Sequence, residues 1–300
     1  MGIGDDCALL RPDAGLELAI TTDMLVEGRH FLPGADAEAL GHKALAVNLS
    51  DLAAVGATPR WATLALALPA ADERWLEAFA RGFFALAGRY ELDLIGGDTT
   101  RGPLLTINIT ALGEVPAGVA MYRAGARPGD DIWVSGELGG AALALQEPAL
   151  AARSPALADR LHRPEPRVEL GERLRGLAHA AIDVSDGLAG DLGHILERSQ
   201  VGAVIEYARI PKPAAFERFR EIERDCVLSG GDDYELVFTA AQAQRRDIEA
   251  LGRELKIALS RIGAVQAGAP KLTVLDADGR PLAHRGGFDH FAAEPAGGRR

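Results

Sequence analysis

Apolar residues in the first part of the chain recur at spacings of two in some stretches and of three to four in others, which predicts strands and helices in turn. Helical spacing covers 36–55 and ends at Gly56 and Pro59. A second helix is expected over 72–90, with Asp72 as its N-cap. Strands are predicted at 16–23, 60–69, 92–100 and 103–115. The strand at 92–100 is expected to be buried and to run into a glycine turn.

A segment rich in glycine and proline, 116–131, is the best candidate for a domain boundary. Beyond it the pattern again mixes both spacings. Strands are expected at 131–136, 180–184, 201–207 and 234–240. Helices are expected at 137–146, within 149–176, after Gly187 and at 241–255. A hairpin is expected at 271–283. We therefore predict two domains, 1–122 and 123–300, of the α+β (mixed α/β) class.

Composition narrows the classes of function. Of 300 residues, 48% are apolar and 25% charged, as in a globular protein with a packed core. The net charge of −11 (32 basic minus 43 acidic residues) argues against nucleic acid as a partner, and it would repel anionic substrates unless cations bridge them. Cys7 and Cys226 give neither a disulfide framework nor a zinc spacing. With no signal-peptide pattern and no apolar stretch of membrane-spanning length, we expect a cytoplasmic protein without a membrane partner.

Carboxylates recur in short turns rich in Gly, Ser and Thr beside apolar runs. They are Asp5, Asp6, Asp23, Asp51, Asp98, Asp183, Asp186, Asp232 and Asp233. Aspartate is also a common N-cap and turn residue, so each one taken alone has a structural alternative. Asp51 fits that alternative least, because it lies inside an apolar helical segment with no Lys or Arg one turn away, and a buried carboxylate needs a partner.

Together these turns indicate a magnesium site, since Mg²⁺ prefers oxygen ligands and is usually held by a few carboxylates together with substrate phosphates. Thr21 and Thr22, just before Asp23, add further oxygens. Two or more ions would let an acidic cleft bind a polyphosphate. Calcium is the alternative ion, but the sequence has no EF-hand loop.

Familiar phosphate-binding motifs and the zinc-protease motif are absent. The sequence contains no Walker A loop, no protein-kinase glycine loop and no H-E-x-x-H. The stretch “GELGGAALAL” at 136–145 is a glycine-rich start of a helix, which either binds an anion or allows tight packing. Any phosphate chemistry must then depend on the aspartate turns and their metals.

A series of motifs, in order from Gly4 to Phe291, resembles those of the thiamine-monophosphate kinase family. The motifs are “GDDCALL”, “TTDMLVEGRHF”, “KALAVNLSDLAAVGATP”, “LIGGDTTRGP”, “RAGARPGDDIWVSG”, “IDVSDGLAGDLGHI”, “LSGGDDYELVFT” and “GFDHF”. The superfamily includes aminoimidazole ribonucleotide synthetase and selenophosphate synthetase. The motifs are specific in combination, although “GGD” or “SDG” alone would mean little.

The resemblance implies a two-domain ATP-binding fold of the aminoimidazole ribonucleotide synthetase type. The N-terminal domain would form a barrel across a homodimer interface, and the C-terminal domain would be an α/β sandwich. It implies a kinase that converts ATP and thiamine monophosphate to ADP and thiamine diphosphate, completing biosynthesis of that coenzyme, by in-line transfer assisted by several Mg²⁺ ions. The family carries a further segment before the “GDD” turn, so we expect either a late start of this sequence or a reduced nucleotide lid.

The resemblance also implies the site residues. The metal ligands would be Asp6, Thr21, Thr22, Asp23, Asp51, Asp98, Asp183 and Asp186, the nucleotide contacts Gly97, Asp98, Arg123 and Ser185, and the substrate contacts His30, Asp232 and Phe288. No general base is expected, because the acceptor phosphate is already anionic.

Several of these residues have structural alternatives. Arg123 would clamp a phosphate or form a surface ion pair, and Phe288 would stack on the thiazolium or pyrimidine or anchor the C-terminal segment. His30 would meet substrate or be a buried, hydrogen-bonded histidine, and Asp232 would meet the aminopyrimidine or thiazolium or form a turn. Asp191, one helical turn beyond Gly187, is expected to be solvated or structural.

Two other functions stay open. One is a different ATP-dependent synthetase of the same superfamily; a selenophosphate synthetase would carry a reactive Cys or selenocysteine in an N-terminal glycine-rich loop, whereas Cys7 follows the first aspartate pair. The other is a non-catalytic nucleotide-binding or metal-sensing module, which would not need the whole set of acidic residues.

Overall fold

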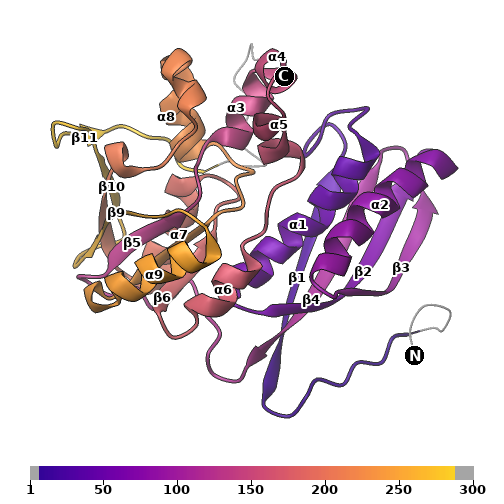
Figure 1. The fold of residues 1–300 in the computed structure, drawn as a ribbon, viewed down its shortest axis with the longest axis horizontal. Helices are drawn as coiled ribbons and strands as arrows, with labels where there is room; N and C mark the ends of the chain where they lie inside the picture. Colours follow the sequence, from indigo (N-terminus) through magenta and orange to yellow (C-terminus); the bar gives the residue numbers. More distant parts are fainter. Residues whose placement is uncertain (1–6, 288–300) are drawn as a thin grey trace.

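The computed structural model describes residues 7–287, which form two β-sheets with helices packed on them (Figure 1). The first sheet has the strand order β1-β4-β2-β3, with β4 antiparallel to both neighbours and β2 parallel to β3. Its strands are β1 (Leu16–Val26), β2 (Thr58–Leu68), β3 (Asp93–Arg101) and β4 (Thr106–Pro116). Helices α1 (Ala37–Val55) and α2 (Glu73–Arg89) cover one face of this sheet.

Both of these helices begin at aspartate caps. The Asp36 side chain accepts a hydrogen bond from the Ala39 N–H, and Asp72 accepts from two N–H groups in the first turn of α2. Such carboxylates satisfy amides that a helix leaves unpaired at its start. The prediction of Asp72 as an N-cap is therefore confirmed.

The second sheet has the strand order β11-β10-β7-β9-β5-β8-β6. Its strands are β5 (Asp131–Ser135), β6 (Ala178–Asp183), β7 (Gly202–Glu206), β8 (Leu236–Ala240), β9 (Leu259–Gln266), β10 (Leu272–Leu275) and β11 (Pro281–Leu282). The helices are α3 (Gly140–Gln146), α4 (Pro148–Ala151), α5 (Pro155–His162), α6 (Val168–Leu174), α7 (Leu188–Ser199), α8 (Arg220–Ser229) and α9 (Arg245–Leu255). Residues of α3, α7 and α8 share one hydrophobic cluster, while those of α6 and α9 share another with α1.

The cluster that contains α1 joins the two sheets. Leu45 and Leu49 of α1 belong to the same buried cluster as Trp133 of β5 and Phe238 of β8, whose rings stack with centroids 6.4 Å apart. α1 is consequently buried on almost all sides. This packing fixes the C-terminal half of α1, which carries Asp51, against β1 on one side and β6 on the other.

The expectations of burial and of a glycine turn at 92–100 are both wrong. β3 continues through Gly96 and Gly97 and is largely exposed, because it is an edge strand with neither of its faces fully covered. A Cβ at Gly97 would lie 1.9 Å from the Leu64 carbonyl oxygen, so the close strand pairing itself requires glycine there. The pattern also missed β9 and α8, whereas the other predicted strands, helices and the 271–283 hairpin are confirmed to within a few residues.

The mixed α/β fold class is confirmed, and the strands of residues 7–287 do not close into a barrel within one chain. Within residues 7–287, β1 and β3 are the two edges of an open four-stranded sheet. None of the helices in this described part is both long and apolar enough to cross a membrane.

Candidate functional site

Four of the predicted carboxylates meet at the junction of the two sheets. Asp23 lies on β1, Asp51 on α1, Asp183 at the end of β6, and Asp186 in the turn between β6 and α7. They are close enough to influence one another electrostatically, with Asp51 and Asp186 acting on Asp23, and Asp51 and Asp23 acting on Asp183. The fold thus assembles one acidic cluster from segments that lie far apart in sequence.

Hydroxyl groups hold two members of this cluster in place. The Thr21 hydroxyl donates to the Asp51 carboxylate, linking β1 to α1. The Ser50 hydroxyl donates to Asp183 Oδ2 at 2.7 Å in a buried position, linking α1 to β6. Sequence reasoning missed Ser50, and the available signal was a hydroxyl residue directly before Asp51 within an apolar helical segment.

The cluster carries strong mutual repulsion. Burial, followed by the charges of Asp51 and Asp186, raises the pKa of Asp23 to about 7. Burial and then Asp51 raise the pKa of Asp183 well above its usual range. Burial also raises the pKa of Asp51, which the Thr21 hydrogen bond and Arg123 partly oppose. A cation bound among these groups would relieve both effects.

The donors fit a hard cation, since they are carboxylate and hydroxyl oxygens of the kind Mg²⁺ prefers. Within the described part of the chain, however, no three His, Cys, Asp or Glu side chains converge into a group that could hold a metal ion. Like charges gain nothing from close approach until a counter-charge joins them. The cluster therefore has suitable ligands but no converged metal cage.

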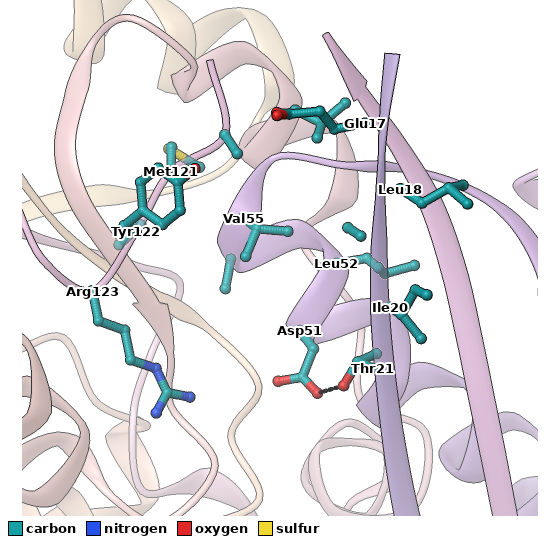
Figure 2. A pocket seen from close by; sticks show the side chains of 15 residues that line it. Glu17, Leu18, Ile20, Thr21, Asp51, Leu52, Val55, Met121, Tyr122 and Arg123 are labelled. Atoms are coloured by element: carbon teal, nitrogen blue, oxygen red, sulfur yellow. Dashed lines mark hydrogen bonds between the residues drawn. The ribbon is translucent and has the colours of Figure 1, made fainter. Parts of the chain in front are cut away.

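A cavity of about 600 Å³ lies beside this cluster (Figure 2). Asp51 and Thr21 line one side, and Met121, Tyr122 and Arg123 line the other. The Arg123 side chain extends toward the side that carries Asp51. The cavity thus combines an apolar wall with one guanidinium opposite a carboxylate, as small-molecule sites commonly do.

Asp232 is held by two side chains that sequence reasoning missed. Lys43 of α1, only 4% exposed, donates to Asp232 Oδ2 at 3.0 Å, and the Tyr234 hydroxyl donates to Oδ1 at 2.9 Å. A lysine within the apolar run of α1 was the available signal, because a buried ammonium needs a counter-charge. His30, in the turn after β1, accepts the Val26 N–H at Nδ1.

The turn that carries Ser185 and Asp186 is fixed by Asp191. The Asp191 Oδ2 accepts from the N–H groups of Ser185, Asp186 and Gly187 at 3.0, 3.0 and 3.1 Å. Asp191 is 2% exposed, so the expectation of a solvated residue is wrong and the structural alternative holds.

Two predicted ligands lie away from this cluster. Neighbouring residues of a strand project to opposite faces, so Thr22 projects from the face opposite Thr21 and bonds to Asn108 and Thr110. Asp98, adjoining Gly97, is on β3 at the other edge of the sheet. Asp6 and Phe288 lie outside the described residues.

The glycine-rich start of α3 already has an anionic partner. The Asp233 carboxylate accepts from the N–H groups of Gly139 and Ala141 at 2.7 and 3.4 Å. An external anion is therefore not favoured at this helix, and the alternative of a packing role for 136–145 is the better one.

Comparisons with known proteins match nearly the whole chain. Family models described as AIR synthase related protein match residues 4–115 with the N-terminal domain and 127–274 with the C-terminal domain. A thiamine-monophosphate kinase of Escherichia coli (strain K12) is 47% identical over 97% of this chain and 92% of its own length.

Solved structures of thiamine-monophosphate kinases also match this chain. The crystal structure of thiamine-monophosphate kinase from Stenotrophomonas maltophilia K279a is 50% identical with a TM-score of 0.87, covering 94% of this chain and 92% of that one. A structure of AaThiL complexed with AMPPCP and TMP is 30% identical with a TM-score of 0.82, covering 94% and 89%.

Proposed function

The chain belongs to the thiamine-monophosphate kinase family of AIR synthase related proteins, and from this premise we propose how its residues phosphorylate thiamine monophosphate with ATP. The products are ADP and thiamine diphosphate. The observation that carries the proposal is the acidic cluster of Asp23, Asp51, Asp183 and Asp186 beside a cavity with Arg123 on its opposite wall. The relative that binds AMPPCP and TMP supports the same pair of substrates.

The nucleotide is assigned to the cavity beside Asp51. Its volume of about 600 Å³ suits a small molecule, and Met121 and Tyr122 give an apolar wall for a base. The planar guanidinium of Arg123 suits a phosphate, which it can bind through two parallel hydrogen bonds. Ser185 in the turn beside Asp186 is a further proposed contact.

The acidic cluster is assigned to several Mg²⁺ ions, with Thr21 and Asp6 as additional ligands. Bound Mg²⁺ would neutralise phosphate charge and hold the phosphate oxygens for in-line displacement. The chain itself supplies orientation: Ser50 and Thr21 fix two of the carboxylates, and Arg123 aligns the donor. Because the acceptor oxygen is already anionic, no general base is assigned.

Thiamine monophosphate is assigned to the side of the cluster that carries Asp232, with His30 and Phe288 as further contacts. Asp232 offers a carboxylate to an aminopyrimidine donor or to the cationic thiazolium. Lys43 and Tyr234 each donate to one of its oxygens, which fixes the direction of that carboxylate.

A homodimer is proposed to complete the site through a barrel that spans both chains. The strand register puts Asp98 in one row with Ala65 and Met24, on the face that α1 and α2 leave uncovered, where Thr22 also lies. Asp98 and Thr22 are separated by three strand spacings, roughly 14 Å, so one chain cannot join them. Exposed Ile20 (63%) and Met24 (55%) give this face the apolar surface that a second copy would cover.

That pairing would also bring Gly97 of one chain to the nucleotide of the other. Replacing Ile20 by Asp should yield monomers in light scattering and lose most turnover. A monomeric variant with full activity would refute the shared site.

We further propose that the chain divides into units 1–122 and 123–300 and acts in the cytoplasm, where ATP is available.

The activity is tested with the purified protein, MgATP and thiamine monophosphate. Thiamine diphosphate and ADP in equal amounts are expected, with no product when EDTA replaces Mg²⁺. Turnover of selenide or a formylglycinamidine substrate instead would support another synthetase of the superfamily. Tight ATP binding in calorimetry without any product would support a non-catalytic module.

A further inference from the structure

We propose that Asp191 is a positioning residue for phosphoryl transfer, acting through the backbone of the turn formed by residues 185–187. This inference rests on the proposed function, which assigns Ser185 to the nucleotide and Asp186 to the metal ions. Asp191 touches neither ligand in this proposal. Its role is to hold the turn that carries both side chains in one shape, beside the acidic cluster.

The contacts that carry this proposal all end on one oxygen. Asp191 Oδ2 accepts three consecutive backbone N–H groups, those of Ser185, Asp186 and Gly187, at 3.0 to 3.1 Å. Each of these hydrogen bonds restrains one backbone amide, so together they fix the direction of three consecutive peptide groups. With Asp191 only 2% exposed, water has little access to replace them.

The carbonyl side of the same turn is held by the segment before β8. The Asp232 N–H donates to the Ser185 carbonyl at 2.9 Å, and the Tyr234 N–H donates to the Val184 carbonyl at 2.9 Å. Asp191 therefore supplies the second of two restraints, one on the acceptors of the turn and one on its donors. Removing it leaves three amides without a protein partner on that side.

Asp191 differs from the other aspartate caps of this chain. Asp36 and Asp72 precede their helices and accept from amides inside the first turn. Asp191 lies inside α7 and accepts backward, from the loop before the helix. It does so beside the like charge of Asp186, which an asparagine would avoid. A helix cap alone does not need that arrangement, whereas a turn that must keep its shape under a bound polyphosphate does.

The test compares Asp191→Asn with Asp130→Asn in the full-length protein. Asp130 is a matched control: it is 4% exposed, accepts the Arg127 N–H at 2.9 Å and pairs with His179. His179 is at the opposite end of β6 from Asp183, about 13 Å away at the usual rise of a strand. Both variants replace one buried carboxyl group that accepts backbone hydrogen bonds in a turn.

Two readouts do not depend on turnover. Calorimetry measures binding of Mg²⁺ with AMPPCP, and hydrogen exchange measures protection of the 185–187 amides. For Asp191→Asn we expect binding weaker by about 10-fold or more, which corresponds to about 1.4 kcal/mol, together with faster exchange in the turn. For Asp130→Asn we expect binding within about twofold of the unmodified chain at an equal or larger loss of stability.

Unchanged nucleotide binding by a folded Asp191→Asn variant would overturn the inference. An equal loss of nucleotide binding in Asp130→Asn would also overturn it, because the loss would then follow from reduced stability in general. If thiamine monophosphate proves not to be the substrate, the binding and exchange results still decide the role of Asp191. When the unmodified protein catalyses phosphoryl transfer, the Asp191→Asn variant should show a larger rise in the KM for MgATP than in the KM for thiamine monophosphate.

Discussion

Replacing Lys43 by methionine tests how the two halves of the molecule share the acceptor site. Lys43 is on α1, 4% exposed, and its partner Asp232 belongs to the segment before β8. Methionine keeps the length of the side chain and removes the charge. The variant should therefore lose the ion pair without opening a cavity.

The expected magnitude follows from the exposure of the two partners. Breaking a fully buried pair costs about 3–5 kcal/mol, and losing an exposed pair costs about 0–1 kcal/mol. The Asp232 side chain is 31% exposed and keeps the Tyr234 hydroxyl on its other oxygen. We expect an intermediate loss of about 2 kcal/mol in the free energy of unfolding.

The functional effect should be selective for the acceptor. Without Lys43 the Asp232 carboxylate loses one of its two fixed directions, so the KM for thiamine monophosphate should rise by about 10-fold or more, or about 1.4 kcal/mol. The KM for ATP should stay within about twofold, because the proposed nucleotide cavity lies on the other side of Asp51. Steady-state kinetics with each substrate varied in turn measures both constants.

Arg163→Met is the control. Arg163 pairs at 3.4 Å with Glu38, which lies on α1 as Lys43 does, but both side chains of this pair are more than a third exposed. It should cost no more than about 1 kcal/mol and leave both KM values unchanged. An acceptor KM that is unchanged or lowered in Lys43→Met, or an equal rise in both constants, would refute the reasoning. Addition of Asp232→Asn should then cause little further loss in the free energy of unfolding, because the ion pair acts as one unit in stability.

Three further predictions concern the acidic cluster and α7. Asp51→Asn should lower kcat by about 100-fold or more while the urea midpoint stays the same or rises, because a buried charge is removed; near-normal turnover would exclude Asp51 as a ligand. Gly190→Ala should lower stability by about 1 kcal/mol, because its Cβ would lie 2.7 Å from the Gly287 Cα. Gly193→Ala has open space around the new Cβ and should raise stability by about 0.5–1 kcal/mol. Urea denaturation that ranks the two variants in the reverse order would contradict this packing. Burial raises the pKa of Asp23 to about 7, so the folded protein binds a proton at Asp23 more tightly than the unfolded chain does. Without Mg²⁺, the stability that this protonated carboxyl contributes should therefore be lost as the pH rises from about 4 to 7. Urea midpoints at pH 5 and 7 should show a smaller pH dependence in Asp23→Asn, and identical profiles would argue against the shift.

Much of the secondary structure could be predicted because it depends on neighbours in the chain. The cap Asp72 and the spacing of apolar residues in α1 and α2 are local features, and they appear in the structure as expected. The prediction for 92–100 failed because exposure depends on whether a strand is central or at the edge, which its own residues do not encode.

The candidate site divides in the same way. The sequence determined the types of group available, namely aspartates in short turns, and through its motifs the family to which the chain belongs. Only the tertiary structure decided that Thr21 and Asp23 face α1 while Thr22 faces the opposite side, that Asp98 lies at the far edge, and that Lys43 pairs with Asp232 across 189 residues. Periodicity is set by the geometry of each helix or strand, whereas contacts between distant residues arise from how those elements pack, and the packing of α1 between two sheets is what brings the carboxylates together.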